Sequence, residues 1–155
     1  AAHCRRTDFL RAREKTTPGP KAIAAQLNSA LREWDAAQVF IATDAPDDLR
    51  KDLQAQVNGK LVFLDDAPEI RDRLQHPGKL AAVDMWIAAR ADVFIGTQES
   101  RFTMHIQLER SWLGKPVHTS DREFCKSARS SRPCIAPEYR HSGRKGSQHS
   151  LRLEL

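Results

Sequence analysis

The chain has 155 residues, of which 40% are hydrophobic and 29% charged, as in one soluble globular domain, and no apolar run approaches the length of a membrane span. Its net charge of +5 comes from residues 126–155, which hold seven Lys or Arg and two Glu, so residues 1–125 are neutral overall. Because this basic segment has a single aromatic residue, Tyr139, and no apolar periodicity, we expect no nucleic-acid partner.

The beginning of the chain predicts a short strand, with His3 and Arg5 on one face and Cys4, a buried thiol, on the other. Arg5 then stands at the carboxyl end of this strand, where open α/β sheets bind ligands. A guanidinium in that position can hold a phosphate through two parallel hydrogen bonds. A surface ion pair of Arg5 with Asp8 or Glu14 is the alternative interpretation.

Beyond a charged connection at residues 9–20, helix and strand patterns alternate. Helices are expected over residues 21–34, from Pro46 to about Val57, from Pro68 to about Gln75, over 79–90 and over 102–113. Strands are expected over residues 39–42, 61–64 and 93–95. This alternation predicts a parallel sheet covered by helices on both faces, in other words a Rossmann-like α/β domain. We place that domain at residues 1–125 and a basic, loose tail at residues 126–155.

The segment after the strand at 93–95 has the pattern of a phosphate site. The strand stops at Gly96, and Ser100 stands where a helix N-cap belongs. Free backbone N–H groups and the positive end of the helix dipole suit an anion, and a glycine lets the ligand approach the backbone. Many such junctions bind nothing, so this interpretation needs support from other residues.

Asp84 is the most informative single residue, because it shares a helix face with Leu80, Val83 and Ile87. A carboxylate directed toward a core must find hydrogen-bond donors. These donors could come from a nearby Arg, from a helix N-terminus or from the N–H edge of a ligand base. A structural ion pair is the alternative.

The acidic residues show no metal-binding pattern. The chain has no Asp-x-Asp pair, and we interpret the pairs Asp47-Asp48 and Asp65-Asp66 as solvated helix caps. No Cys or His pair has zinc spacing. A diphosphate at this site would therefore be balanced by Arg5 and the amides around Ser100, without metal.

Three cysteines are too few for a disulfide scaffold. Cys125 and Cys134 flank a short polar loop, and they could close a small disulfide ring if the compartment is oxidising.

Five blocks of sequence, spread in order over about residues 1–134, resemble the C-terminal half of the GDP-fucose protein O-fucosyltransferase 2 family. They are His-Cys-Arg-Arg-Thr-Asp-Phe at 3–9, Val-Phe-Ile-Ala-Thr-Asp at 39–44, Val-Asp-Met-Trp-Ile at 83–87, Phe-Ile-Gly-Thr at 94–97 followed by Ser-Arg-Phe-Thr at 100–103, and Arg-Glu-Phe-Cys at 122–125. The resemblance implies a GT-B glycosyltransferase, in which two Rossmann-like domains enclose the donor and the C-terminal one binds the nucleotide.

The activity implied by the resemblance is transfer of L-fucose, with inversion, from GDP-fucose to Ser or Thr of folded thrombospondin type 1 repeats. It implies the endoplasmic reticulum as the location, and neither a cofactor nor a required metal. The expected partners are therefore GDP-fucose and the repeat-containing acceptor proteins.

The resemblance also implies a set of GDP-fucose-binding residues: His3, Cys4, Arg5, Asp84, Ser100, Arg101 and Phe102. Arg5 is the implied catalytic residue, which holds the diphosphate and stabilises the departing GDP. Asp84 is implied to recognise the nucleotide at its guanine edge. Arg101 replaces the Thr usual in the family and adds a cation beside the phosphates, which could strengthen their binding or crowd the site. The spacing from Cys125 to Cys134 is longer than in the family.

The chain begins without Met, at residues that read as the end of a strand, so we expect a fragment that lacks the family's N-terminal domain. That domain is expected to supply the carboxylate that takes the proton of the acceptor hydroxyl. We therefore expect the chain alone to be inactive. The alternative is a non-catalytic nucleotide-binding domain, a pseudoenzyme that keeps the GDP site, and a third interpretation is a polyanion-binding protein that works through its tail.

Overall fold

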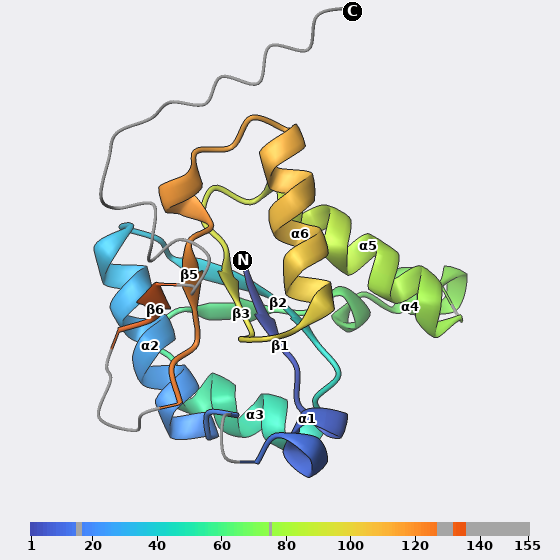
Figure 1. The fold of residues 1–155 in the computed structure, drawn as a ribbon. Helices are drawn as coiled ribbons and strands as arrows, with labels where there is room; N and C mark the ends of the chain where they lie inside the picture. The colour runs from blue at the N-terminus through green and yellow to red at the C-terminus, as the bar shows by residue number, and fades with distance from the viewer. Residues whose placement is uncertain (15–16, 75, 127–131, 136–155) are drawn as a thin grey trace, which may run out of the picture.

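The computed structural model describes residues 1–14, 17–74, 76–126 and 132–135, which form an open sheet between layers of helices (Figure 1). The strands are β1 (Ala2–Cys4), β2 (Gln38–Thr43), β3 (Lys60–Val62), β4 (Ile95–Gly96), β5 (Arg122–Glu123) and β6 (Cys134–Ile135). Their order in the sheet is β3-β2-β1-β4-β5-β6. The first five strands are parallel, and β6 is antiparallel to β5.

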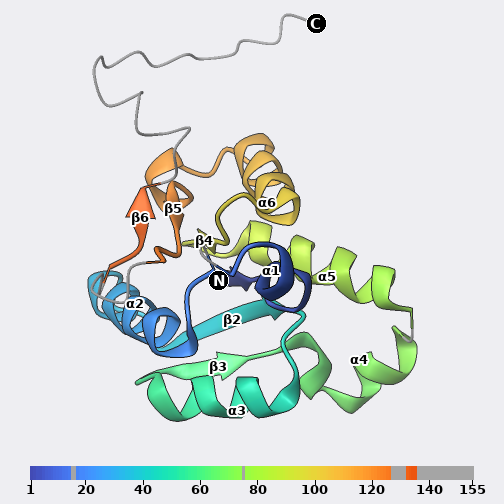
Figure 2. The ribbon, with the colours of Figure 1, turned by 60° about the horizontal axis from the view of Figure 1, so that its bottom comes forward.

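Two α-helices follow β1, one follows β2, two follow β3 and one follows β4. They are α1 (Thr7–Ala12), α2 (Pro20–Glu33), α3 (Asp47–Gln56), α4 (Pro68–Arg73), α5 (Pro77–Arg90) and α6 (Arg101–Trp112), with short 3-10 helices η1 (Leu64–Asp66) and η2 (Val117–Thr119). Helices α2 and α3 lie on one face of the sheet, and α5 and α6 lie on the other (Figure 2). The predicted α/β alternation with a mainly parallel sheet is therefore confirmed.

Two apolar clusters, one on each side of the sheet, hold these layers together. The larger cluster joins α2 and α3 to the sheet through side chains such as Ile23, Leu27 and Ile41. The smaller cluster includes Phe94 and Ile106, both with no exposed surface. Removal of this apolar surface from water is the main force that holds the helices against the sheet.

Helix α1 corrects the prediction of an irregular connection from residue 9. None of its residues is buried, so it lacks the apolar periodicity by which a helix is recognised. It begins instead at the carboxylate of Asp44, which accepts the backbone N–H of Arg6 at 2.7 Å and that of Thr7 at 3.3 Å. A carboxylate at the amino end satisfies free N–H groups and complements the helix dipole.

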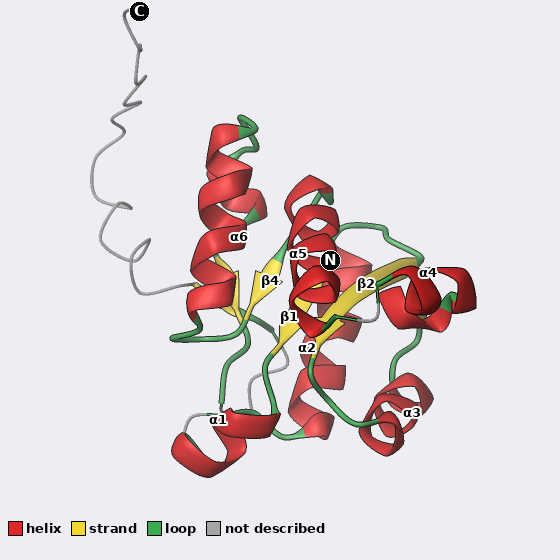
Figure 3. Ribbon diagram, turned by 90° about the vertical axis from the view of Figure 1, so that its right-hand side faces the viewer, coloured by secondary structure: helices red, strands yellow, loops and turns green. Residues whose placement is uncertain are grey.

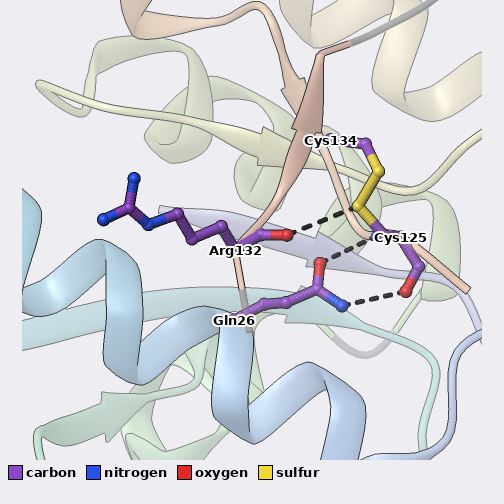
Figure 4. The surroundings of a disulfide bond; sticks show 4 residues. All are labelled: Gln26, Cys125, Arg132 and Cys134. Atoms are coloured by element: carbon purple, nitrogen blue, oxygen red, sulfur yellow. Dashed lines mark hydrogen bonds between the residues drawn. A yellow bond between two sulfur atoms is a disulfide. The ribbon is translucent and has the colours of Figure 1, made fainter. Parts of the chain in front are cut away.

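The sheet also extends beyond the predicted domain boundary at Cys125. Strand β6 pairs with β5 in the register Glu123 to Cys134, and a disulfide joins Cys134 to Cys125, with 5.3 Å between their Cα atoms (Figure 4). The side chain of Gln26 in α2 makes two hydrogen bonds to the backbone of Cys125, both at 2.8 Å. Its Oε1 accepts from the N–H group, and its Nε2 donates to the carbonyl oxygen. The disulfide that the sequence allowed but did not decide is thus present. The other residues of the predicted tail, 127–131 and 136–155, lie outside the described residues.

Helices α5 and α6 pack side by side (Figure 3), and the buried Arg110 connects them. Arg110 of α6 is 1% exposed and donates to the carbonyl oxygens of Ala89 at 3.2 Å, Ala91 at 2.6 Å and Asp92 at 2.9 Å. It therefore caps the carboxyl end of α5, where carbonyl groups lack helical partners. This contact fixes the relative position of the two helices.

Candidate functional site

The centre of the sheet contains the point at which the strand order reverses. Strands β1 and β4 are neighbours, but the chain continues from β1 toward β2 and from β4 toward β5. Their connections therefore leave in opposite directions and open a crevice at the carboxyl ends of the strands. In open α/β sheets, ligands bind in this crevice.

A cavity of about 470 Å³ opens at this edge. Its lining comes from the carboxyl ends of β1 and β2, from α3 at Arg50, from the turn after β3, from the part of α5 up to Asp84, and from α6 at Phe102. Four of the seven predicted donor-site residues line it together: His3, Arg5, Asp84 and Phe102. The amino end of α5, at Pro77 and Gly78, also borders the cavity, which the sequence analysis did not anticipate.

The other three predicted residues, Cys4, Ser100 and Arg101, are not among those that line the cavity. Cys4 faces the opposite side of its strand, as the alternation predicted, and contributes to a separate apolar cavity of about 20 Å³. Burial raises the pKa of its thiol to about 12, so it is a neutral core residue. Ser100 is buried at the N-cap of α6, where its side chain makes no capping hydrogen bond, and Arg101 is exposed.

Arg5 adopts the ion pair that the sequence analysis gave as the alternative, and it also lines the cavity. Its Nε donates to Asp8 Oδ1 at 2.8 Å and its Nη2 to Asp8 Oδ2 at 3.1 Å. Asp44 Oδ2 lies 3.3 Å from the same Nε. These contacts orient the guanidinium and raise the pKa of Arg5, chiefly through the hydrogen bond to Asp8.

His3 is a neutral residue of the cavity wall. Burial is the main cause that lowers the pKa of its imidazole, to about 3. Its Nδ1 lies 2.9 Å from the Thr103 hydroxyl, and its ring centre lies 4.7 Å from that of Phe102. Because the ring stays uncharged at physiological pH, it can donate or accept a hydrogen bond but does not act as a cation.

Two threonines that the sequence analysis did not single out connect β1, β4 and α6. The Thr97 hydroxyl donates to the His3 carbonyl at 2.6 Å and accepts the backbone N–H of Arg5 at 3.0 Å. Gly96 permits the close approach of α6, because a Cβ at this position would lie 2.2 Å from Thr103 Cγ2. The glycine that we predicted to admit a ligand therefore admits a helix.

Asp84 has no ion pair within the described residues, contrary to the structural alternative. Its Oδ1 is buried and has no hydrogen-bond partner in the described part of the chain. The pKa of its carboxyl is raised to about 7, mainly by burial and then by nearby Asp65, while the charge of Arg50 opposes this rise. An unpaired buried carboxyl that lines a cavity is a strong candidate for ligand recognition.

Asp65 is not the solvated cap that we predicted. Both of its carboxylate oxygens accept hydrogen bonds from Nη1 of Arg50, at 2.7 and 2.8 Å, and both residues line the cavity. The sequence contains one indication of this arrangement, since Asp65 follows β3 and Arg50 follows β2, and parallel strands end at the same edge of a sheet. The spatial pairing itself has no local signature.

The described part of the chain contains neither a candidate metal-binding cluster nor a helix that could span a membrane. Among residues 1–14, 17–74, 76–126 and 132–135, no group of three or more His, Cys, Asp or Glu could hold a metal ion. No helix of these same ranges has the length and apolarity needed to cross a bilayer.

The fold and the cavity together define a Rossmann-like α/β domain with a ligand site at the reversal point of its sheet. The family model for GDP-fucose protein O-fucosyltransferase matches residues 1–113. The chain therefore belongs to the GDP-fucose protein O-fucosyltransferase family, and the resemblance noted in the sequence is confirmed.

Individual relatives agree with the family match. The chain is 39% identical over 127 residues to GDP-fucose protein O-fucosyltransferase 2 of Drosophila melanogaster, which covers 81% of this chain and 26% of that protein. It is 35% identical over 125 residues to the protein of that name from Caenorhabditis elegans, covering 79% of this chain and 28% of the relative. The human protein of that name is 31% identical over 123 residues, with 79% and 28% covered. The chain thus spans about a quarter of the length of these curated relatives.

Proposed function

We propose that this chain forms the donor-binding part of a protein O-fucosyltransferase, which transfers L-fucose from GDP-fucose to a Ser or Thr hydroxyl. The observation that carries this proposal is that Arg5, Asp84 and Phe102, from three separate segments of the chain, line one cavity at the carboxyl edge of the sheet. Membership of the family supports the same activity.

The resemblance supports a more detailed proposal. The domain would belong to a GT-B enzyme, in which a second Rossmann-like domain closes over the donor, and transfer would proceed with inversion and without a metal. The acceptors would be folded thrombospondin type 1 repeats in the endoplasmic reticulum. The disulfide between Cys125 and Cys134 supports an oxidising compartment, since disulfides are rare in the cytosol.

Arg5 retains hydrogen-bond donors for a diphosphate after its contacts with Asp8. A guanidinium carries five N–H groups, and Asp8 receives one from Nε and one from Nη2. Within the described residues, no acceptor is found for Nη1 or for the second proton of Nη2. These donors can bind two oxygens of a diphosphate, while Asp8 and Asp44 keep the guanidinium in a fixed orientation.

The reaction explains why a fixed cation is needed there. When the acceptor oxygen attacks the anomeric carbon of fucose, the bond from that carbon to the β-phosphate oxygen breaks. Negative charge builds on the departing oxygen, and positive charge builds on the sugar ring. A guanidinium already aimed at this oxygen stabilises the transition state more than the bound substrate, so it accelerates the chemical step.

The acceptor hydroxyl must lose a proton, and we assign no residue of this chain to that role. His3 is unsuited to it, because burial lowers the pKa of its imidazole to about 3. The matched region is only 26% of the fly relative and 28% of the nematode one. We therefore propose that other parts of the full-length protein supply the base, and that the isolated chain binds GDP without transferring fucose.

Isothermal titration calorimetry of the chain with GDP tests the donor site. We expect binding that Asp84→Ala weakens at least tenfold, because loss of a hydrogen bond to a charged group typically costs about 1.5 to 3 kcal/mol. Asp72→Ala, which changes an exposed acid of α4 away from the cavity, is the matched control. A folded chain that does not bind GDP would overturn the proposal.

Two further measurements separate the proposed function from its rivals. Binding that survives Asp84→Ala and fades steeply with salt would indicate adsorption to basic residues instead of a nucleotide site. A transfer assay with GDP-fucose should show no turnover by the isolated chain and turnover by the full-length protein. An inactive full-length protein that still binds GDP would be a pseudoenzyme.

A further inference from the structure

Arg50 is a cation of the cavity that the proposed reaction does not use. It belongs to the first part of α3, its side chain is 18% exposed, and it lines the same cavity as Asp84. Its Nη1 donates to both oxygens of Asp65 at 2.7 and 2.8 Å, and its Nε donates to the Ala45 carbonyl at 2.9 Å. Its guanidinium carbon lies 5.1 Å from the centre of the Phe63 ring. These contacts hold the guanidinium in one orientation.

The Arg50 guanidinium, although held by Asp65 and Ala45, still has donors at Nη2 without an acceptor among the described residues. Of its five N–H groups, the one on Nε and the two on Nη1 have acceptors. Within the described ranges, the two on Nη2 have none. Asp84 offers the complementary group, a buried Oδ1 with no donor among the same residues. Arg50 and Asp84 are close enough that the charge of Arg50 lowers the pKa of the Asp84 carboxyl.

A carboxylate beside a guanidinium matches one nucleobase well. Along its edge guanine presents two donors, N2–H and N1–H, followed by two acceptors, O6 and N7. A carboxylate binds the donor half, and an arginine binds O6 and N7. Adenine has an acceptor at N1 and a donor at N6, so both central positions are reversed. The same pair of side chains would therefore face unfavourable contacts with adenine.

We propose that Arg50 is a specificity-determining residue, which donates from Nη2 to O6 and N7 of guanine while Asp84 accepts from N1–H and N2–H. This inference rests on the proposed GDP site and assigns its base selection to two side chains, from α3 and α5, that line the same cavity. Arg5 remains the residue for the diphosphate, and Asp65 acts as a positioning residue that fixes the Arg50 guanidinium.

The test is calorimetry with three nucleoside diphosphates on two variants of the chain. Arg50→Met keeps the length of the apolar stem but removes the guanidinium. This substitution should lower the affinity for GDP about tenfold to a hundredfold, because a bidentate base contact typically contributes about 1 to 3 kcal/mol. Inosine diphosphate retains O6 and N7, so its affinity should fall by the same factor, whereas the affinity for ADP should not fall. Arg90→Met, on α5 and outside the cavity lining, is the matched control and should leave all three affinities unchanged.

Other outcomes overturn the assignment. An equal loss of affinity for GDP, inosine diphosphate and ADP would place Arg50 at the diphosphate or in a structural role. Unchanged affinities for all three would exclude it from the site. If Arg50→Met does not fold, Arg50→Lys keeps the charge but not the planar set of donors, and it should lose the same preference for GDP over ADP. Failure of the unmodified chain to bind GDP overturns the proposed function instead, so the two failures are distinguishable.

Discussion

The hydroxyl of Thr103 lies 2.9 Å from Nδ1 of His3 and also accepts the backbone N–H of Thr97 at 2.9 Å. One side chain at the amino end of α6 thereby joins the two strands that flank the reversal point of the sheet. Phe102, the preceding residue, contacts the His3 ring and lines the cavity. The position of α6 against the sheet therefore decides the shape of the candidate donor site.

Substitution of Gly96 should displace α6. In Gly96→Ala the new Cβ would lie 2.2 Å from Thr103 Cγ2, so we expect a loss of about 1 to 3 kcal/mol in the free energy of unfolding and weaker GDP binding. Urea denaturation and calorimetry measure the two effects. Gly19→Ala, where no atom lies within 4 Å, is the control.

A second substitution should relieve this clash. Thr103→Ser removes Cγ2 but keeps the hydroxyl, so the double variant Gly96→Ala, Thr103→Ser should recover part of the stability lost in Gly96→Ala. If the two changes are simply additive, the close approach of Thr103 is not the reason for the glycine.

Asp84 should make stability depend on pH. Its pKa in the folded chain is raised to about 7 from an ordinary value of 3.8, mainly by burial and then by Asp65. Between these values the folded state holds a proton that the unfolded state has released. The contribution of this group to the free energy of unfolding therefore falls as pH rises from about 4 to about 7, and it is least favourable above pH 7.

Asp84→Asn removes this titration. After allowance for partial exposure, we expect the variant to be about 1 to 2 kcal/mol more stable than the unmodified chain at pH 8, and to differ little from it near pH 4. Urea denaturation at both pH values measures the difference between the two proteins. A difference that is equal at pH 4 and pH 8 would contradict the raised pKa.

The same group should couple GDP binding to pH. Only the ionised carboxylate can accept two N–H groups from guanine, so GDP affinity should rise as pH increases from 6 to 8. Asp84→Asn should flatten this rise. ADP carries the same diphosphate and serves as the correction for phosphate titration in calorimetry. A GDP profile parallel to that of ADP would remove Asp84 from base recognition.

If the proposed function is correct, Arg5→Ala in the full-length protein should lower turnover about a hundredfold or more, because one lost transition-state contact of this kind typically costs about 3 to 4 kcal/mol. The fold should survive, since the Arg5 side chain is 38% exposed. Arg5→Lys should also be harmful, because a point charge does not replace a planar set of donors. Arg90→Ala changes an arginine of similar exposure, 40%, outside the cavity, and should retain activity. Near-normal turnover in Arg5→Ala would exclude Arg5 from the mechanism.

Removal of the disulfide should destabilise the outer strands. Cys125 and Cys134 are nine residues apart, and a bridge over so short a loop typically contributes about 2 to 3 kcal/mol. The double variant Cys125→Ser, Cys134→Ser should lose about this amount in urea denaturation. A reducing agent should have the same effect on the unmodified chain and none on the variant, in which Cys4 is the remaining thiol. Equal stability in all four conditions would argue against a structural role.

Local patterns predicted the parts of the fold that have strong periodicity. The apolar spacing of Ile23, Leu27 and Leu31 indicated α2, and these three side chains are buried against the sheet. Helix α1 and strand β6 were missed for a physical reason. The first buries no side chain and depends on Asp44, and the second has two residues and is held by β5 and a disulfide.

By itself, the sequence determined the alternation of strands and helices, and it marked Arg5 at a strand end and Asp84 on a helix face, because hydrophobic period and strand position are encoded locally. Only the tertiary structure decided that these two residues share a cavity with Arg50, that Cys4 faces away from it, and that Gly96 admits a helix. Such relations depend on how strands far apart in the chain are ordered in the sheet, and no local stretch of residues contains that order.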